Sequence, residues 1–485
     1  MNPLRLVLSI ALIPVLLGLF ACNKQQENPS VAVKPLNLNT SKPNIVVILC
    51  DDLGYGDLEC YGHPNIKTPN LNLMAKEGIR FTNFYSAAPV CSPSRVGLLT
   101  GRSPNRAGVY DWIPQNNPVH MQASEVTIPQ LLQNAGYTTC MSGKWHCNGR
   151  FNTADQPQPG EAGFKHWFAT QNNAKPSHEN PNNFVRNGKE VGLLEGYSCQ
   201  LVVDEALTWL AVKQKVKPEL PFFMYVAFHE PHEPVASPEE LVNQYKDMSV
   251  SEDQAQYFAN VANVDAAVGK LISGLKALGL DENTLVIFTS DNGPETLNRY
   301  KNANRSFGTP DPLRGMKLWT TDAGFRVAGI MRWPGKIKAG QVSNQPVSSL
   351  DFLPTFCEIA ETEPPADLDL DGTSFLPALK GNPIQRDKPL VWVYYNAINE
   401  RRVAMRDGDW KVLARLDLPK LKGMNAENAE MVKAASLSDF QIFKISDDIG
   451  ESEELSASHP EKLAELKQRL ETHYNELVAD SHVWD

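Results

Sequence analysis

The stretch Asn44-Ile45-Val46-Val47-Ile48-Leu49, which runs on into Asp51-Asp52, decides the fold of this chain. It is a nearly continuous run of apolar residues, most of them β-branched. Such a run is typical of a strand that is buried on both faces of a parallel sheet. Residues 222–227 and 284–288 repeat the same form. The three stretches therefore predict three buried strands.

Amphipathic helical patterns separate these strands, for example at residues 128–135 and 200–212. Alternating helices and buried strands predict an α/β fold with helices on both sides of the sheet. Ligands of such sheets bind beyond the carboxyl ends of the strands. All three strands deliver polar residues to that edge: Asp51-Asp52, His229 with His232, and Asp291-Asn292.

The composition changes after about Gly381. Residues 391–395 and 402–406 have the pattern of antiparallel strands, and the second leads into the turn Asp407-Gly408-Asp409. Residues 461–477 form a charged amphipathic helical pattern near the end of the chain. We therefore expect a catalytic domain over residues 43–385 and a smaller α+β subdomain over residues 386–485.

Composition and charge exclude some classes of function. The chain has 485 residues, of which 42% are hydrophobic and 21% are charged, as in an ordinary globular protein. Its net charge of −10 argues against nucleic acid as a partner. An anionic substrate would need a local basic pocket to hold it against this overall charge.

The N-terminus has the pattern of a targeting segment. Arg5 precedes an apolar run over residues 6–20, which is short for a permanent membrane span. The run ends in Leu19-Phe20-Ala21-Cys22, which is similar to a bacterial lipobox. We expect a signal peptide over residues 1–21, a lipid on Cys22 and a flexible tether over residues 22–42. The protein would then be a membrane-anchored bacterial lipoprotein facing the periplasm or the cell surface; a plain secretory signal is the alternative.

The residues that close the first and third strands suggest a metal site. Asp51, Asp52, Asp291 and Asn292 offer only oxygen ligands, which favour a hard cation such as Ca²⁺ or Mg²⁺. Acidic residues after a strand are more often helix caps, but here two buried strands each end in such a pair.

Cys91-Ser92-Pro93-Ser94-Arg95 predicts the start of a helix that ends at Gly101. Cys91 would then be an accessible thiol at a helix N-terminus, where backbone N–H groups favour an anion. Arg95 would lie one turn further on the same face. The residues alone leave two alternatives, a thiolate nucleophile or a structural cysteine.

This pentapeptide, with its continuation Val96-Gly97-Leu98-Leu99-Thr100-Gly101-Arg102, closely resembles the signature of type I sulfatases. The resemblance implies the alkaline phosphatase-like fold, with a large, mixed, mostly parallel sheet. It also implies that a maturing enzyme oxidises Cys91 to formylglycine, whose hydrated aldehyde attacks sulfate esters. In that family the four oxygen ligands and an oxygen at position 91 hold the metal, which we expect to be Ca²⁺ rather than Mg²⁺.

Further motifs of the family follow in order. Gly143-Lys144-Trp145-His146 implies that Lys144 contacts the sulfate and that His146 bonds the hydrated aldehyde. His229-Glu230-Pro231-His232 makes His232 the candidate general acid, while His229 contacts substrate or only packs its loop. Leu313-Arg314-Gly315-Met316-Lys317 supplies Lys317 as the second sulfate-binding lysine and Arg314 as a substrate contact.

Two stretches depart from the family pattern. Asp322-Ala323-Gly324-Phe325-Arg326 stands where Glu-Gly-Gly-x-Arg is usual, and Cys147-Asn148-Gly149 stands where Leu-Gly is common. These departures spare the catalytic set but put the substrate rim in doubt. Trp112, Trp167, Asn172, Asn173 and Trp319 are candidates for a sugar subsite there.

The resemblance implies a sulfuric ester hydrolase whose partner is a sulfated oligo- or polysaccharide. We expect a marine algal polysaccharide such as ulvan or carrageenan, with a glycosaminoglycan as the alternative. Three rival functions are a phosphonate or phosphodiester hydrolase of the same superfamily, a phosphatase of the alkaline phosphatase superfamily, and a non-catalytic glycan-binding lipoprotein. The phosphatase would need a Ser or Thr nucleophile and more metal ligands, and the sequence shows neither. In an oxidising compartment the remaining cysteines leave room for one or two disulfides, whose pairing the sequence does not give: Cys50, Cys60, Cys140, Cys147, Cys199 and Cys357.

Overall fold

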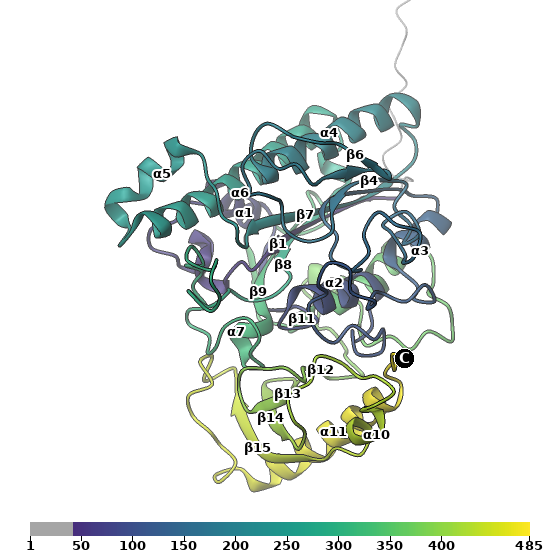
Figure 1. Ribbon diagram of the computed structural model, residues 1–485, viewed down its shortest axis with the longest axis vertical. Coiled ribbons are helices and arrows are strands. Elements are labelled where there is room, and N and C mark those ends of the chain that lie inside the picture. The colour runs from purple at the N-terminus through teal and green to yellow at the C-terminus, as the bar shows by residue number, and fades with distance from the viewer. Residues whose placement is uncertain (1–41) are drawn as a thin grey trace, which may run out of the picture. The chain divides into compact units, whose positions relative to one another are not determined.

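The computed structural model describes residues 42–485 (Figure 1). The expected signal peptide, the lipidation site Cys22 and the tether up to residue 41 lie outside the described residues. Within residues 42–485, no helix is both long enough and apolar enough to cross a membrane.

The main sheet has eleven strands, in the order β10-β2-β9-β8-β1-β7-β3-β4-β5-β6, with β11 paired to β2. Their bounds are β1 Asn44–Asp51, β2 Ile79–Tyr85, β3 Thr138–Lys144, β4 His166–Thr170, β5 Val185–Arg186, β6 Lys189–Glu190, β7 Phe222–Pro231, β8 Thr284–Ser290, β9 Arg326–Arg332, β10 Gln341–Ser343 and β11 Val347–Ser348.

The centre of this sheet is parallel, as the sequence predicts. Strand β1 lies between β7 and β8, and Val47 is in register with Tyr225 on one side and Ile287 on the other. Strands β3 and β4 continue the parallel order beyond β7. Strand β9 pairs antiparallel with β8 and β2, which makes the sheet mixed. The carboxyl ends of β8, β1, β7 and β3 therefore meet at one edge.

Helices cover both faces of the sheet (Figure 1). Alternate residues of β1 enter opposite cores: Val46 and Ile48 face the helices α1, α4 and α6, whereas Ile45 and Val47 face α2, α3 and α8. This burial on two faces explains why the strand is apolar throughout. The helices are α1 Pro69–Glu77, α2 Cys91–Thr100, α3 Ile128–Asn134, α4 Ser198–Val216, α5 Glu239–Tyr245, α6 Glu252–Ala277, α7 Asp322–Phe325, α8 Phe352–Ile359, α9 Leu376–Leu379, α10 Ala429–Lys433 and α11 Pro460–Ala479.

A second, antiparallel sheet follows at the C-terminus, coloured green to yellow in Figure 1, in the order β12-β13-β14-β15. Its strands are β12 Leu390–Val393, β13 Arg401–Asp407, β14 Trp410–Leu416 and β15 Leu437–Lys444. Met405 and Val412 of this sheet pack with Leu470 and Tyr474 of α11 in a core of their own. The predicted fold class, a large mixed sheet with a small antiparallel sheet and a terminal helix, is confirmed.

The described residues contain no disulfide. All seven cysteines of residues 42–485 are free, and all except Cys60 are buried. Cys50 lies within β1 and Cys140 lies within β3, and both side chains are buried.

Candidate active site

Four neighbouring strands bring polar side chains to one edge of the sheet. Asp51 is the last residue of β1, and Asp291 with Asn292 directly follows β8. Lys144 ends β3, and His232 directly follows β7. Asp52 has a positive φ of 64°, a left-handed conformation that non-glycine residues seldom adopt and that turns the chain sharply after β1.

Three buried cations pair with three buried carboxylates at this edge. Lys144 Nζ lies 2.5 Å from Asp51 Oδ2. Lys317 Nζ lies 2.7 Å from the Asp52 carboxylate. Arg95 donates to Asp291 Oδ2 from Nε at 2.9 Å, and a second guanidinium nitrogen lies 2.8 Å from the same oxygen. Pairing of this kind is what permits charges to be buried.

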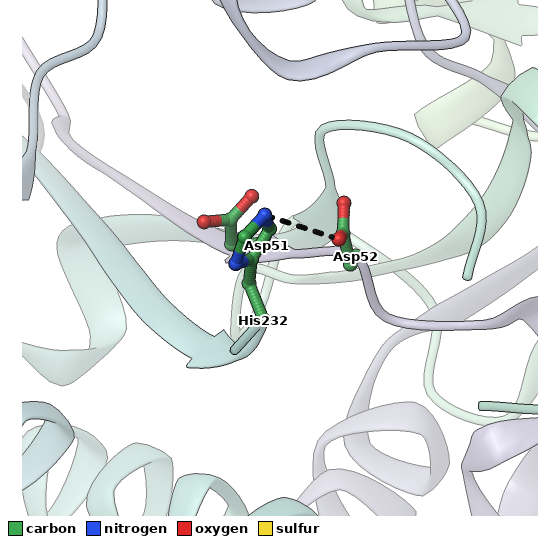
Figure 2. A group of neighbouring side chains, drawn as sticks. All are labelled: Asp51, Asp52 and His232. Carbon is green, nitrogen blue, oxygen red and sulfur yellow. Dashed lines mark ion pairs between the residues drawn. The ribbon is translucent and has the colours of Figure 1, made fainter. Parts of the chain in front are cut away.

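The oxygen set has free capacity for a cation. Asp51 Oδ1 and Asn292 Oδ1 are buried and accept no hydrogen bond within the described residues. Ligand atoms of Asp51, Asp52 and His232 lie within 4.8 Å of one another. Figure 2 shows these three side chains grouped together. Buried acceptors without a donor need an explanation, and a hard cation held by Asp51, Asp52, Asp291 and Asn292 supplies one.

The acidic groups of this set influence one another. Burial raises the pKa of Asp291 to about 7, and the neighbouring Asp51 carboxylate adds to the effect. The pKa of Asp51 is well below its usual range, because Lys144, His232 and Arg95 together outweigh its burial. A bound divalent cation would favour the ionised form of every one of these carboxylates.

Cys91 is the first residue of α2, as predicted. The expected exposure is wrong: the residue is only 3% exposed, because Val90, Leu318, Tyr394 and Ala397 pack around it. Burial raises the pKa of the thiol to about 11, although Lys144 and Lys317 act in the opposite direction. An unmodified Cys91 would therefore be a neutral thiol at neutral pH rather than a thiolate.

Cys91 opens into a cavity of about 460 Å³, a volume typical of small-ligand sites. His146, His232 and Lys317 also line this catalytic cavity. The remaining predicted residues lie behind them and are at most 3% exposed: Asp51, Asp52, Arg95, Lys144, Asp291 and Asn292. The fold thus brings the predicted metal, nucleophile and sulfate-binding residues together beneath one cavity.

The two histidines of the cavity are held in defined orientations. His146 Nε2 lies 3.1 Å from the Ile113 carbonyl, so in the neutral ring it donates there and leaves Nδ1 as an acceptor. His232 Nδ1 lies 2.6 Å from the Glu233 carbonyl. Its Nε2 is 3.5 Å from Asp52 Oδ2, the contact drawn as a dashed line in Figure 2. Burial lowers the pKa of both rings.

Two predicted substrate contacts do not lie at the cavity. His229 is 1% exposed, its Nε2 is 2.7 Å from Thr170 Oγ1, and its ring packs on Phe184. This favours the alternative in which His229 only packs its loop. Arg314 donates to the Glu451 carbonyl at 2.7 Å and lies over the Phe443 ring. The substrate role expected for both residues is therefore not seen.

Some of the predicted sugar-subsite residues line the catalytic cavity and others do not. Trp112, which is 44% exposed, lines the catalytic cavity together with Asn172 and Asn173. Trp167 and Trp319 are not among its lining residues, and Trp167 is buried against the Phe151 ring.

Sequence reasoning missed several residues of the cavity. Glu295 lies 3.8 Å from Lys317 and pairs with Arg299, whose Nε is 2.6 Å from Glu295. Asn396 and Lys422 reach the cavity from the C-terminal part of the chain. The spacing of Glu295 and Arg299, four residues apart and just after Asn292, could have indicated the first pair. Nothing in the sequence pattern points to Asn396 or Lys422.

The large mixed sheet, the small C-terminal sheet and the polar strand edge agree with the sulfatase fold of the solved structures that this chain resembles. The family model described as Sulfatase matches residues 43–362, and the model described as N-sulphoglucosamine sulphohydrolase, C-terminal, matches residues 316–431. The chain therefore belongs to the sulfatase family, and it is a sulfuric ester hydrolase.

Two curated proteins and one solved structure illustrate the similarity. The chain is 37% identical over 380 residues to N-acetylgalactosamine-6-sulfatase of Rattus norvegicus, covering 73% of this chain and 69% of that protein. It is 31% identical over 356 residues to an ulvan-active sulfatase of Formosa agariphila, covering 69% and 65% respectively. The structure of Ps i-CgsB in complex with k-i-k-neocarrahexaose superposes with a TM-score of 0.76 at 29% identity, covering 91% of this chain and 94% of that one.

Proposed function

We propose that this protein hydrolyses sulfate esters on oligosaccharides derived from a sulfated algal polysaccharide. One observation carries the proposal: Cys91, Lys317, His146 and His232 line a single cavity whose floor is the buried carboxylate set. These are the residue types that a sulfate ester needs around it, namely a nucleophile position, cations and proton-transfer groups.

The cations hold the sulfate. Lys317 lines the cavity, and Lys144 lies directly behind it with its Nζ on Asp51. Together they place positive charge where the nonbridging oxygens of a sulfate gain negative charge as the ester bond breaks. Because both are fixed by carboxylates before substrate arrives, they need no reorganisation during the reaction. Arg95, paired with Asp291, fixes the start of α2 and with it position 91.

The two histidines divide the proton transfers. His232 lines the cavity with its Nδ1 held by the Glu233 carbonyl, and as the protonated ring it would donate a proton from Nε2 to the leaving sugar oxygen. Asp52, 3.5 Å away, stabilises that protonated form against the effect of burial. His146 keeps an unprotonated Nδ1 and would accept a proton from a hydroxyl at position 91.

Two groups complete the proposed site. Formylglycine, made from Cys91 by a maturing enzyme, would supply in its hydrated form the hydroxyl that attacks sulfur. Ca²⁺, held by Asp51, Asp52, Asp291 and Asn292, would supply positive charge beside that hydroxyl and the sulfate. The partnerless oxygens of Asp51 and Asn292 support the presence of such a cation.

The relatives support a carbohydrate substrate and differ on its source. An ulvan-active sulfatase and a structure that binds neocarrahexaose favour an algal polysaccharide. A second candidate is N-acetylgalactosamine 6-sulfate of a glycosaminoglycan, which the 37% identity to N-acetylgalactosamine-6-sulfatase favours.

We also propose that Cys22 carries a lipid that anchors the protein to a bacterial membrane, with the catalytic domain over residues 43–385 facing the periplasm or the cell surface. The lipobox-like end of the apolar run at residues 6–20 supports this.

The test of the function is sulfate release from a panel of defined compounds. The panel contains nitrophenyl sulfate, carrageenan and ulvan oligosaccharides, N-acetylgalactosamine 6-sulfate, and phosphate and phosphonate monoesters. We expect release of sulfate from the algal oligosaccharides at the highest kcat/KM. Faster turnover of the phosphorus esters would contradict the proposal in favour of the phosphonate hydrolase.

A further inference from the structure

A second cavity, of about 610 Å³, lies beside the catalytic cavity. Asn172 and Asn173 line both, so the two cavities meet at this pair of residues. Both residues belong to the loop that directly follows strand β4. The predicted catalytic and metal-binding residues do not line this second cavity.

The lining of the second cavity is dominated by amides. Eight of its 17 lining residues are Asn or Gln, and they come from four separate stretches of loop. We call it the amide cavity. Each amide offers two N–H donors and a carbonyl acceptor, which is the complement of a sugar hydroxyl that both donates and accepts. Phe151 adds an aromatic side chain to the lining.

The charges of the amide cavity cancel. Arg150 and Lys175 are offset by Asp155 and Glu190. Arg150 lies 3.6 Å from Asp155, and Lys175 has only a 3.5 Å contact with Gln115. The catalytic cavity has three cations in its wall, Arg299, Lys317 and Lys422, against two carboxylates, Asp111 and Glu295. The amide cavity is therefore suited to a neutral, hydroxyl-rich group rather than to a second sulfate.

Several of these amides have no partner in the folded chain. Asn116, Asn152 and Asn182 line the cavity, and their side chains make no hydrogen bond within residues 42–485. The Oδ1 atoms of Asn172 and Asn173 are withdrawn from solvent and also lack a partner among the described residues. A buried acceptor without a donor is unfavourable, and a bound hydroxyl at the junction of the two cavities would supply the missing donor.

We propose that the amide cavity binds an unsulfated sugar unit next to the unit whose sulfate is removed. This inference rests on the proposed function, because it assigns to the same site a substrate of at least two sugar units. It predicts that the protein prefers an oligosaccharide to a sulfated monosaccharide or an aryl sulfate, and that the preference arises in the amide cavity.

The test compares nitrophenyl sulfate with di- and hexasaccharides of κ-carrageenan and of chondroitin 6-sulfate. The variant is Gln115→Ala with Asn182→Ala; both residues are exposed and neither has a positive φ, so alanine causes no strain. Gln468→Ala, an exposed amide on α11, is the matched control. Loss of two hydrogen bonds should lower kcat/KM on the better hexasaccharide about tenfold, through KM, and leave nitrophenyl sulfate unchanged.

A second variant, Asn182→Trp, fills the amide cavity without touching the catalytic one. It should lower kcat/KM on the di- and hexasaccharides to the level of a sulfated monosaccharide and spare nitrophenyl sulfate. Equal kcat/KM of the wild type on a sulfated monosaccharide and on the oligosaccharides, or unchanged kcat/KM on the oligosaccharides in both variants, would overturn the inference.

Calorimetric binding of the same hexasaccharides separates this inference from the proposed function. Binding that weakens in the Gln115→Ala, Asn182→Ala variant, without sulfate release from any compound, would support the amide cavity and contradict the sulfatase function. If the protein releases sulfate but the variants bind the hexasaccharides as tightly as the wild type, the result would support the sulfatase function and contradict the role of the amide cavity.

Discussion

Arg95 and Asp291 are 196 residues apart in the chain and form a buried ion pair in which two guanidinium nitrogens lie 2.9 and 2.8 Å from one carboxylate oxygen. Arg95 also donates to the Lys144 carbonyl at 2.8 Å. The pair ties the start of α2, which carries position 91, to the end of β8. The nucleophile position and the metal-binding edge are therefore fixed to each other by a single side chain.

Arg95→Lys should lower kcat on nitrophenyl sulfate by roughly 100-fold, because lysine keeps the charge but loses the planar fork. Arg186→Lys is the control for the loss of the planar guanidinium, since Arg186 binds both oxygens of Glu205 through two nitrogens, away from the catalytic residues and partly exposed. Steady-state kinetics of both variants provide the measurement. A wild-type kcat in the Arg95→Lys variant would show that catalysis does not depend on the planar guanidinium of Arg95.

Removal of metal should lower both activity and thermal stability. A bound ion at 1,000 times its Kd stabilises the folded state by about 4 kcal/mol. We expect exhaustive chelation to abolish sulfate release and lower Tm, and added Ca²⁺ to restore both.

Asp51→Asn should remove the response of Tm to Ca²⁺. Asp265→Asn is its control: Asp265 is equally buried but accepts from the backbone of Asn70 and Leu71, so it should lose stability and keep the response. If chelation changed neither the Tm of the wild type nor its rate of sulfate release, the result would argue against the metal site.

His232→Ala should affect poor leaving groups most. A sugar alkoxide needs a proton and a nitrophenolate does not, so we expect a loss of roughly 10²- to 10⁴-fold on the oligosaccharide and a much smaller loss on nitrophenyl sulfate. His229→Ala should affect both substrates alike, because His229 packs against Phe184 beneath the loop. Equal losses for His232→Ala would place that residue in sulfate binding and make His146 the next candidate for the acid.

Lys411→Met should destabilise the fold by about 3–5 kcal/mol. Lys411 of β14 is fully buried between Asp322 and Glu451, at 2.7 and 2.8 Å, and the variant leaves the buried Glu451 without a cation and Asp322 with Arg326 alone. Denaturant unfolding provides the measurement. The carboxylates of the variant would bind protons more tightly when folded than when unfolded, so its deficit should shrink as the pH falls.

The control for Lys411→Met is Lys444→Met, whose pair with Asp447 is exposed to solvent and should contribute little to stability. We call Lys411, Asp322 and Glu451 the Lys411 cluster. Similar losses of unfolding free energy in the two variants would show that the burial of this cluster does not make its ion pairs more important for stability. The cluster includes Asp322, where this chain departs from the usual family residue, and it joins α7 to the second sheet.

The sequence predicted the central strands well because β1, β7 and β8 are buried on both faces and must be apolar throughout. Strand β15 escaped prediction because most of its residues are only half-buried and its pattern is weak. Asp51, Asp291 and Cys91 could be found because each stands at the end of a strand or at the start of a helix. Lys422 and Asn396 could not, because only packing of the C-terminal part of the chain brings them to the cavity.

The most direct test of the account is the chemical state of residue 91 in active protein. Trypsin cleaves after Arg80 and Arg95, so the peptide 81–95 carries this position alone among the cysteines. Protein produced with a maturing enzyme should give this peptide with the thiol sulfur lost and an aldehyde gained, in proportion to the specific activity. Full sulfatase activity in protein whose peptide 81–95 retains an intact Cys91 thiol would contradict the account.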